Sequence, residues 1–595
     1  MTHRYVLTLL SVLMLCLNAA GRTPEHFRYL YPLPGSTMVS PATDIIIRPD
    51  AVSAHGLSPL HCTPRGAVSG LHDGRTILSD DGETTVFLPA VPFAPGERVT
   101  VVITREGAPP AAGSETQFSF TISPHWTPAA QYDPMRGPEA PERGLTRVAA
   151  GGLPADFPAI TVSIPGTPSP GYLFLSNMTM GSGAPNTPYI MILDTGGQPV
   201  AYRRTVSEST DFKLQPNGLL TYDDSGLQCF VALDSTLTPV DQFRCGNGYA
   251  TNWHELRILP NGHALILGDD PRTVRMDTVV TGGSPSAYVL GIVVQELDRS
   301  KNVVFEWRTF DHFAVTDATH LDLTSGYIDA VHSNAIELDT DDNILISSRY
   351  LDEITKINRQ TGDIIWRLGG KNNQFTFVND TLGFRYQHAI RRLPNGHVTL
   401  FDNGDFRFPL LSRAVEYALD EVNKKATLVW EYRNTPTIYA PAMGYTQRLP
   451  NGNTIVGWGA SGTAVTEVTP SGSVAFQLTF PAGIYSYRAY KFPWNGPALS
   501  APSAPPVPRS FGLAGNYPNP FNPSTTIVYD IPSAGRATLR VFDMLGREVA
   551  KPVDGQQEAG RHTVVFDGGP FASGVYICRL EAGTLTAAQR MVLVR

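Results

Sequence analysis

Four copies of one short pattern constrain the fold of this chain more than any other feature. Each copy is a strand of alternating apolar and polar residues that runs into Pro-Asn-Gly, and the copies occupy residues 212–218, 256–262, 390–396 and 447–452. A variant copy at 335–343 replaces the turn with Asp-Thr-Asp-Asp-Asn. Asn-Gly tolerates a positive φ and closes tight hairpins with the twist that paired strands require. The pattern therefore predicts a repeated antiparallel hairpin.

The hairpins recur at a spacing that is typical of a β-propeller. Each copy is followed by a second strand and an Asp-containing turn, as at 357–362 before the apolar residues 364–366. This makes about four strands per repeat at periods of roughly 45–80 residues, which is the range of propeller blades. Counting a first copy around 172–202, we predict a six-bladed β-propeller over residues 151–497.

The composition agrees with an all-β chain. Only 17% of the 595 residues are charged, 42% are apolar, and 54 Gly with 49 Pro supply turns. Such a chain has ample apolar surface to bury, so it is expected to be folded and built from short hairpins. The net charge of −8 argues against a nucleic-acid partner, which requires a basic surface, and no nucleotide-binding motif is present.

Shorter regions flank the predicted propeller. Residues 1–21 combine a basic start, an apolar run and small residues, which is the form of a secretory signal peptide. Alternating strands predict an Ig-like β-sandwich over 22–125, with strands at 43–48, 84–88, 98–103 and 117–122. Pro-rich linkers are expected at 126–150 and 498–510, and a small β-domain at 511–595. No later stretch reaches about 18 apolar residues, so no transmembrane segment is expected after signal removal.

The cysteines leave two interpretations open. Cys62, Cys229, Cys245 and Cys578 follow the signal and show no C-x-x-C spacing, which argues against a zinc site. Cys229 and Cys245 fall on neighbouring predicted strands of one hairpin, and an exported protein permits a disulfide there. The alternative is a pair of small buried thiols.

Three histidines occupy one structural position in the repeat. His254, His332 and His388 each stand at the beginning of a strand that leads to a repeat's turn. Equivalent positions in quasi-symmetric blades form a ring around a central channel, so the three imidazoles are expected to meet at one mouth. Strand alternation puts Asn334 on the face of His332. The returning strand brings Arg349 toward the same mouth.

Two chemistries fit this group. Neutral histidines can hold a transition metal. Alternatively, one imidazole can attack an anionic group that the other polar side chains cradle. Arg349 favours the anion, because a guanidinium grips oxyanions and repels cations. Carboxylate ligands are scarce, since by alternation Glu255 faces away from His254. We therefore expect no metal and no other cofactor.

A set of motifs in order resembles the bacterial arylsulfotransferases. The motifs are His332–Asn334, Ser347–Arg349, Ile364–Gly370, Tyr386–His388 and Leu400–Gly404, followed by Ser412–Tyr417 and Val429–Arg433. The resemblance covers most of 151–495. It implies an exported, cofactor-independent enzyme with a six-bladed propeller, which moves a sulfuryl group from a phenolic sulfate ester to a phenol by a ping-pong reaction.

The resemblance also implies roles for the site residues. His388 is similar to the histidine that is sulfurylated, and His254 to the histidine that transfers protons with the phenolic oxygens. His332, Asn334 and Arg349 resemble the group that holds the sulfuryl oxygens. Thr446 matches a further threonine of the family site in a looser alignment. The spacing from His332 to His388 is short for the family, which predicts the loss of a loop at the mouth of the site.

The C-terminal region resembles the sorting domain of type IX secretion. The motifs are Asn516–Ile527, Val541–Val549 and Ser573–Tyr576. The resemblance implies passage through the periplasm of a Gram-negative cell, recognition by the type IX machinery at the outer membrane, and removal of this domain. The mature protein is then secreted or held at the cell surface.

Together these features predict an exported aryl-sulfate sulfotransferase with His388 as its nucleophile. Two other functions remain open from sequence. One is a metal-dependent hydrolase or lyase with His254, His332 and His388 as ligands. The other is a non-catalytic surface propeller that binds glycans or proteins, because a fold alone does not determine chemistry.

Overall fold

The computed structural model describes residues 27–50, 60–105, 115–126, 146–147, 153–180, 186–205, 207–235, 238–494, 511–517, 519–557 and 560–594. Within these ranges every element is a β-strand except four short 3-10 helices, namely η1 (Met276–Thr278), η2 (Thr309–Asp311), η3 (Val315–Asp317) and η4 (Arg349–Leu351). The predicted all-β class is therefore confirmed. In the described part of the chain, no helix is long and apolar enough to cross a bilayer. The predicted signal peptide, the linker at 498–510 and most of the linker at 126–150 lie outside the described residues.

The N-terminal region forms two antiparallel sheets. One has the order β1 (Phe27–Tyr31), β2 (Ile45–Pro49), β6 (Thr85–Pro89) and β5 (Gly74–Leu78), and the other has the order β4 (Gly70–Leu71), β3 (Leu60–Gly66), β7 (Arg98–Arg105) and β8 (Glu115–Thr121). A core that includes Leu30, Ile47, Val99 and Phe120 is buried between them. The four strands expected from alternation are all present, as β2, β6, β7 and β8.

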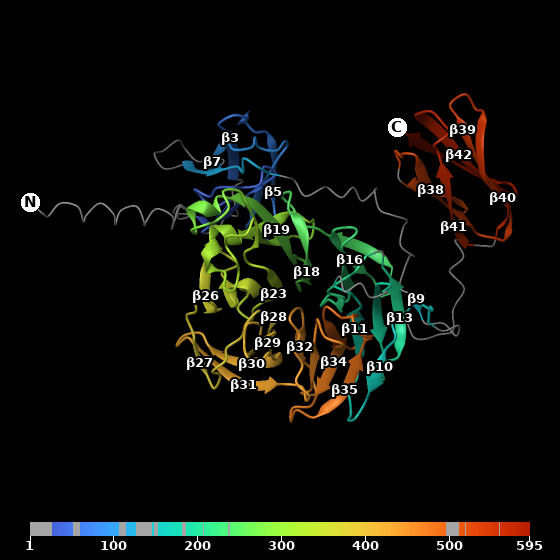
Figure 1. The fold of residues 1–595 in the computed structure, drawn as a ribbon. Helices are drawn as coiled ribbons and strands as arrows, with labels where there is room; N and C mark the ends of the chain where they lie inside the picture. The colour runs from blue at the N-terminus through green and yellow to red at the C-terminus, as the bar shows by residue number, and fades with distance from the viewer. Residues whose placement is uncertain are drawn as a thin grey trace, which may run out of the picture. The chain divides into compact units, whose positions relative to one another are not determined.

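Six further sheets follow, and in Figure 1 they succeed one another around a common centre. The first has the order β36 (Ala489–Phe492), β11 (Tyr172–Ser176), β12 (Tyr189–Leu193), β13 (Pro199–Arg204) and β9 (Thr146–Arg147). The second is β14 (Lys213–Leu214), β15 (Leu220–Asp224), β16 (Cys229–Leu233) and β17 (Pro239–Phe243). The third is β18 (Ala250–Ile258), β19 (Ala264–Val274), β20 (Ala287–Leu297) and β21 (Val303–Arg308), with β22 (Tyr327–Asp329) parallel to β20.

The other three sheets repeat this order. The fourth is β23 (Ser333–Leu338), β24 (Ile344–Ser348), β25 (Glu353–Ile357) and β26 (Ile364–Gly369). The fifth is β28 (His388–Arg392), β29 (Val398–Asp402), β30 (Arg413–Asp420), β31 (Lys425–Tyr432) and β27 (Thr376–Val378). The sixth is β32 (Tyr445–Arg448), β33 (Thr454–Gly457), β34 (Thr463–Val468), β35 (Val474–Thr479) and β10 (Thr161–Ser163).

Strands from both ends of this segment tie its first and last sheets together. β36, near the end of the segment, pairs with β11 in the first sheet. β10, near its beginning, pairs with β35 in the sixth sheet. Hydrogen bonds between distant parts of the chain therefore complete both sheets.

The Pro-Asn-Gly hairpins are present, but the glycine alone takes the left-handed conformation. Gly218, Gly262, Gly396 and Gly452 have φ values of 84° to 88°, whereas the preceding asparagines are not among the described residues with positive φ. The asparagine side chain instead accepts a hydrogen bond from the backbone two residues ahead, as between Asn261 Oδ1 and the amide of His263 at 3.0 Å. Glycine pays no steric cost in that conformation, which explains its place at the end of each turn.

The disulfide that the sequence left open is absent. Cys62, Cys229, Cys245 and Cys578 are all free thiols in the structure. Cys229 opens β16, whereas Cys245 lies beyond the partner strand β17 and donates from its Sγ to the carbonyl of Leu267 in the next sheet, at 3.2 Å. Burial raises the pKa of Cys229 to about 12, so this thiol is protonated and unreactive at neutral pH.

The C-terminal region forms a separate compact unit from the N-terminal sandwich and the six sheets. One of its sheets has the order β37 (Gly512–Tyr517), β38 (Ser524–Ile531) and β41 (Gly560–Asp567), and the other has the order β40 (Glu548–Gln557), β39 (Gly535–Asp543), β42 (Gly574–Ala582) and β43 (Leu585–Leu593). Their facing sides bury an apolar core that includes Ile527, Leu539, Phe566 and Leu580.

Candidate active site

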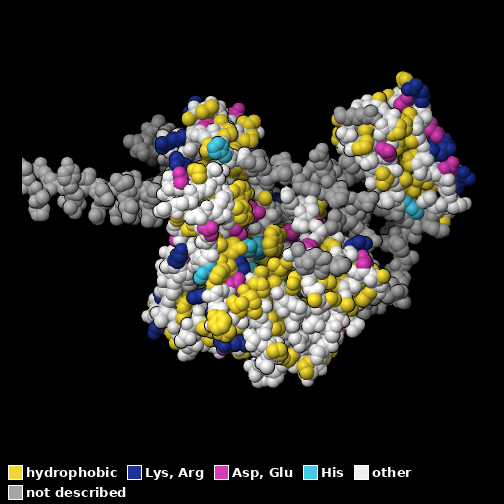
Figure 2. Space-filling view, in the orientation of Figure 1, with side chains coloured by type: hydrophobic (Ala, Val, Ile, Leu, Met, Phe, Trp, Pro, Cys, Tyr) yellow, Lys and Arg dark blue, Asp and Glu magenta, His cyan; other side chains and the backbone are white. Residues whose placement is uncertain are grey.

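The three predicted histidines come together with the predicted arginine near the beginnings of the strands that lie closest to the centre of the ring. His254 lies in β18, His332 immediately precedes β23, and His388 opens β28. The ring centroids of His254 and His332 are 4.8 Å apart. His388 and Arg349 are near enough for their charges to affect the pKa of His254. Figure 2 shows histidine atoms beside hydrophobic side chains near the middle of this ring of sheets.

The surroundings of His388 determine which of its nitrogens carries the hydrogen. Its Nδ1 lies 2.7 Å from Oδ1 of Asn403. The amide nitrogen of Asn403 donates to the carbonyls of Ala440 and Met443, at 2.7 and 2.9 Å, so only its oxygen faces the ring. Nδ1 is therefore the donor and Nε2 keeps a lone pair, which accepts the Met443 amide at 3.3 Å. Burial, followed by the charge of Arg349, holds the pKa of His388 well below its usual range.

His254 has the same tautomer for a parallel reason. Its Nδ1 lies 2.6 Å from Oδ1 of Asn252, whose amide nitrogen donates to Asp269 at 2.6 Å. Its Nε2 is buried and has no hydrogen-bond partner. The ring stacks on Trp253 with centroids 3.7 Å apart. Burial, followed by the charges of His332 and His388, keeps the pKa of His254 well below its usual range, so this ring is neutral at pH 7.

His332 is held on a strained piece of backbone. Its φ is 50°, a left-handed value that is uncommon for residues other than glycine. Its carbonyl accepts the amide of Arg349 at 3.0 Å, and its Nδ1 lies 2.6 Å from Oδ2 of Asp329. These two contacts keep the imidazole between His254, on one side, and the ring of Tyr350, 4.8 Å away on the other.

Arg349 has donor capacity that the resting protein leaves unused. One terminal nitrogen donates to Asp405 at 3.0 Å and to the carbonyl of Pro441 at 2.7 Å. The guanidinium lies over the rings of Tyr386 and Tyr350, at 4.1 and 4.9 Å from their centroids. Its Nε is buried and has no partner. A buried guanidinium with an unpaired donor is suited to receive an oxyanion.

Asn334 makes hydrogen bonds to the backbone around His388. Its amide nitrogen donates to the carbonyl of Gln387 at 2.8 Å, and its oxygen accepts the amide of Ala389 at 3.2 Å. Ala389 has a φ of 62°, so the chain next to His388 is itself in a strained conformation. The side-chain amide of Asn334 thus fixes the backbone of the residues on both sides of His388.

Thr446 makes a hydrogen bond from its hydroxyl to a neighbouring sheet. It is fully buried in β32, and its hydroxyl donates to the carbonyl of Leu400 in the neighbouring sheet at 3.1 Å. None of its contacts among the described residues reaches His254, His332 or His388.

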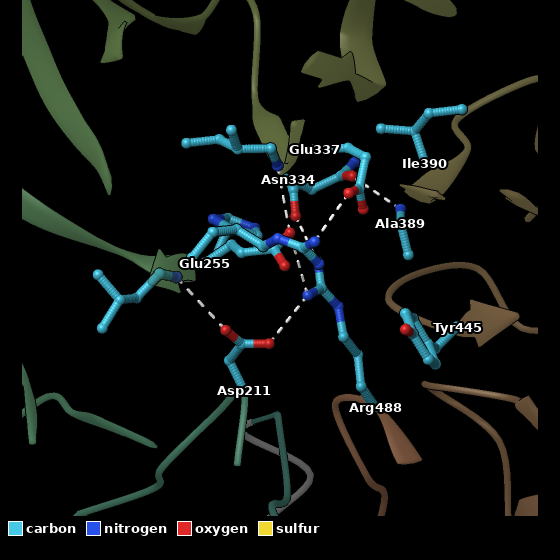
Figure 3. A network of polar contacts seen from close by, with 12 residues as sticks. Asp211, Glu255, Asn334, Glu337, Ala389, Ile390, Tyr445 and Arg488 are labelled. Atoms are coloured by element: carbon cyan, nitrogen blue, oxygen red, sulfur yellow. Dashed lines mark hydrogen bonds and ion pairs between the residues drawn. The ribbon is translucent and has the colours of Figure 1, made fainter. Parts of the chain in front are cut away.

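Arg488 is a central residue that sequence reasoning missed. It lies just before β36, is fully buried, and donates to Asp211 at 2.9 Å and to the carbonyl of Asn334 at 2.5 Å (Figure 3). Glu255 adds a further ion pair at 3.3 Å. Its charge also contributes to the low pKa values of His254 and His388. The only signal in the sequence was an arginine within the aromatic stretch Tyr485–Tyr490.

Glu255 faces away from the histidines and is ionised. Its carboxylate binds Lys213 at 2.8 Å and Arg391 at 2.5 Å. Burial opposes this ionisation, but the charges of Arg391, Lys213 and Arg488 hold the pKa of Glu255 well below its usual range. Among the described residues, no group of three or more His, Cys, Asp or Glu side chains has an arrangement that could hold a metal ion.

The comparisons with known proteins identify the family. A sequence model of the arylsulfotransferase family (ASST) matches residues 169–490, which is more than half of the chain. This protein belongs to the arylsulfotransferase family. That membership supports a sulfotransferase function. A second match, to the secretion system C-terminal sorting domain, covers residues 516–594 and indicates export by type IX secretion to the cell surface or the medium.

Other comparisons give only remote likenesses. No curated protein matches the chain. A protein of unknown function from Bacteroides caccae is 14% identical with a TM-score of 0.33, over 53% of this chain and 99% of that one. A virginiamycin B lyase from Staphylococcus aureus is 9% identical with a TM-score of 0.29, over 62% and 96%. PorZ, a surface component of the type IX system of Porphyromonas gingivalis, is 12% identical with a TM-score of 0.30, over 94% and 75%. Scores this low support no argument about function.

Proposed function

We propose that this protein is an exported aryl-sulfate sulfotransferase whose six sheets are the blades of a six-bladed β-propeller. In this proposal residues 151–497 form the catalytic propeller, 22–125 an Ig-like sandwich and 511–595 the sorting domain. A phenolic sulfate ester is the donor and a phenol is the acceptor. The sulfuryl group passes through a covalent intermediate on His388.

One observation carries the proposal: His388 is neutral, and its hydrogen is committed to Asn403. A neutral imidazole with a lone pair on Nε2 is a competent nucleophile near neutral pH without a metal. Burial supplies the neutral state, and the fixed amide of Asn403 supplies the tautomer. Together they replace the general base that an alcohol nucleophile requires.

In the first half-reaction, Nε2 of His388 gives up the hydrogen bond from the Met443 amide and attacks the sulfur of the donor. The N–S bond forms, the bond from sulfur to the aryl oxygen breaks, and the aryl oxide leaves with the electron pair. The sulfurylated imidazole becomes cationic and still donates its Nδ1 hydrogen to Asn403. Charge on the three outer oxygens is stabilised by Arg349, whose Nε has no other partner, and by His332.

In the second half-reaction, the oxygen of the acceptor phenol attacks the sulfur. The N–S bond breaks and returns its electron pair to Nε2 of His388. His254 takes the phenolic proton on its unpartnered Nε2. Because burial keeps the pKa of His254 low, the resulting imidazolium returns this proton to solvent, and the aryl oxide released in the first half-reaction takes up one proton from solvent. The cycle therefore balances without an added acid or base.

The roles of Asn334 and Thr446 differ from those that the resemblance implied. Both polar atoms of the Asn334 amide are used on the backbone beside His388, which supports a positioning role over a direct grip on the sulfuryl group. Thr446 bonds to Leu400 and is buried between sheets, which supports a structural role.

The test uses the purified mature protein with para-nitrophenyl sulfate, with and without phenol. We expect release of nitrophenol that requires phenol, persists with a chelator and is lost in His388→Ala. The exposed His61, in the N-terminal sandwich, provides the control variant His61→Ala, which should keep full activity.

Other outcomes would replace the proposal. Release into water alone that a chelator abolishes would favour a metal-dependent hydrolase. A wild-type protein that transfers nothing to any phenol would favour a binding function. Mass spectrometry after donor alone is the direct test of the intermediate, since a sulfuryl adduct must appear on His388 and be absent in His388→Ala.

A further inference from the structure

A cavity of about 460 Å³ lies between residues that follow the N-terminal sandwich and the third sheet. Trp126, which follows the last strand of the sandwich, forms one side. Tyr288 of β20 and Tyr327 of β22 form another, and Asp269 and Arg272 of β19 also line it. The mechanism proposed above uses none of the aromatic residues among them.

The cavity is continuous with the supports of two catalytic histidines. Asp269 lines it and binds Asn252, which in turn holds His254, each through a 2.6 Å contact. Tyr327 lies two residues before Asp329, which holds His332. The cavity is therefore linked to two of the imidazoles through the side chains that orient them.

The shape of the third sheet explains why a cavity forms there. Strand β18 stops pairing with β19 at Ala250 and Asp269, whereas β19 and β20 remain paired beyond that point as far as Val274 and Ala287. The β19–β20 hairpin thus extends beyond Ala250, where β18 begins, and its residues line one side of the cavity. The other sheets have no second strand as long as β19 among the described residues.

The walls are aromatic, and their rings are already arranged. Tyr288 and Tyr327 stack with centroids 5.7 Å apart and planes 10° apart, although their side chains are 46% and 59% exposed. Trp126 is half-buried and rests edge-on against Tyr249 at 5.3 Å. Large exposed rings held in fixed positions offer a flat surface on which a planar aromatic ligand loses little entropy.

The charges in the cavity do not favour an anion. Arg272 is paired with Asp270 at 2.8 Å, and its guanidinium lies over Phe310. Burial raises the pKa of Asp269. Arg272 is the only arginine or lysine among the residues that line the cavity, and it already has a carboxylate partner, so the surface suits the uncharged, aromatic part of a substrate better than its sulfate.

We propose that this cavity binds the distal ring of phenolic substrates that contain two or more aromatic rings. The inference rests on the proposed function and adds a substrate class to it. It also gives the N-terminal sandwich a direct part in substrate selection, because Trp126 belongs to that end of the chain. Single-ring phenols reach the histidines without touching the cavity.

The test compares two acceptors, phenol and para-phenylphenol, with para-nitrophenyl sulfate as the donor. Tyr327→Ala should raise the KM for para-phenylphenol by about 3- to 10-fold, the effect of losing one aromatic contact, and leave the KM for phenol unchanged. Trp126→Ala should act in the same direction. Tyr327→Phe should behave like the wild type, because it keeps the ring.

Phe408 provides the matched control. It is 97% exposed in the loop between β29 and β30 and does not line the cavity, so Phe408→Ala should change neither KM. If Phe408→Ala and Tyr327→Ala had equal effects, or if Tyr327→Ala raised the KM for both acceptors alike, the selective role of this cavity would be wrong.

A second measurement separates this inference from the proposed function. Calorimetry on the His388→Ala protein should detect binding of para-phenylphenol that Tyr327→Ala weakens by the same factor. Absence of transfer by the wild type would overturn the proposed reaction. Absence of binding that depends on Tyr327 would overturn the cavity proposal, whether or not transfer is observed.

Discussion

At the scale of single residues, two asparagine amides determine the chemistry of the imidazoles. Asn403 and Asn252 each present an oxygen to the Nδ1 of a histidine, and each is fixed by what its own nitrogen binds. Burial then keeps His388 and His254 neutral. A histidine in the same place with a carboxylate partner would favour the cationic form and lose the nucleophilic lone pair.

The lowered pKa of His388 predicts how the reaction rate depends on pH. Protonation of Nε2 removes the nucleophile, so kcat/KM must fall below the pKa of His388. Because that pKa is lowered, we expect the acidic fall at a pH below the ordinary histidine value of about 6.5. In Asn403→Asp, the new carboxylate favours the imidazolium, so the fall should move to higher pH and kcat should drop by roughly 10- to 100-fold.

Rates measured as a function of pH, on variants checked by circular dichroism, test this prediction. His61→Ala is again the control. If the acidic fall of kcat/KM occurred at the same pH in Asn403→Asp as in the wild type, a group other than His388 would be responsible for it.

At the scale of elements, the turns and strand starts depend on glycines in two different ways. Gly396 ends a hairpin turn with a φ of 84° and open space around it, whereas Gly444 leads into β32 with a φ of 108° against the buried ring of Phe401. A methyl group at Gly396 would meet nothing within 4 Å, but at Gly444 it would lie 2.3 Å from that ring. The first position needs only a permissive backbone, and the second also needs the missing side chain.

We therefore predict unequal effects of the same substitution. Gly396→Ala should lower the free energy of unfolding by about 1 kcal/mol, the cost of a left-handed alanine. Gly444→Ala should cost roughly 1–3 kcal/mol more, because the core beside Phe401 must shift. Chemical denaturation of both variants measures the difference. Equal losses would show that the conformational cost dominates at both sites.

At the scale of the whole molecule, the N-terminal sandwich shares a core with the third and fourth sheets. Tyr29 and Tyr31 pack in one apolar cluster with Phe305 and Trp307. Polar contacts cross the same interface, since His263 binds Asp80 at 2.7 Å and Glu296 at 2.6 Å. The sandwich is thus held firmly enough for Trp126 to form a fixed wall of the cavity.

A buried carboxyl at this interface makes stability depend on pH. Glu306 accepts hydrogen bonds from Tyr31, Asn247 and Gln295, and burial raises its pKa to about 7. Between pH 4.5 and that value the folded protein keeps a proton that the unfolded chain has lost, so stability falls as pH rises. The loss is at most about 3 kcal/mol.

The variant Glu306→Gln removes this titration. We expect its Tm to change less than that of the wild type as the pH rises from about 5 to about 7, the window between the two pKa values. The control is Glu83→Gln, which removes a partly exposed ion pair with Arg28. Its Tm should change with pH as that of the wild type does. If the pH slope survived in Glu306→Gln, Glu306 would not be its source, and other buried carboxyls such as Asp44, whose pKa burial also raises to about 7, would be responsible.

The sequence by itself determined the local features of this protein. Pro-Asn-Gly dictates a hairpin wherever it stands, because a turn is decided by the conformations of adjacent residues. The strand patterns of the sandwich are local in the same sense. His254, His332 and His388 could be singled out because each occupies the same place in a repeated unit, and the C-terminal motifs could be recognised as a contiguous set.

Only the tertiary structure decided how those residues are used. Arg488 binds Asp211, 277 residues away, and Asn334, 154 residues away, and nothing in the neighbourhood of any of the three encodes the contact. For the same reason the amide of Asn334 hydrogen-bonds to the backbone on both sides of His388, Cys245 packs against the next sheet instead of Cys229, and the Thr446 hydroxyl bonds to Leu400. Burial, tautomer and charge at a site depend on which distant segments pack around it, and that information exists only once the chain has folded.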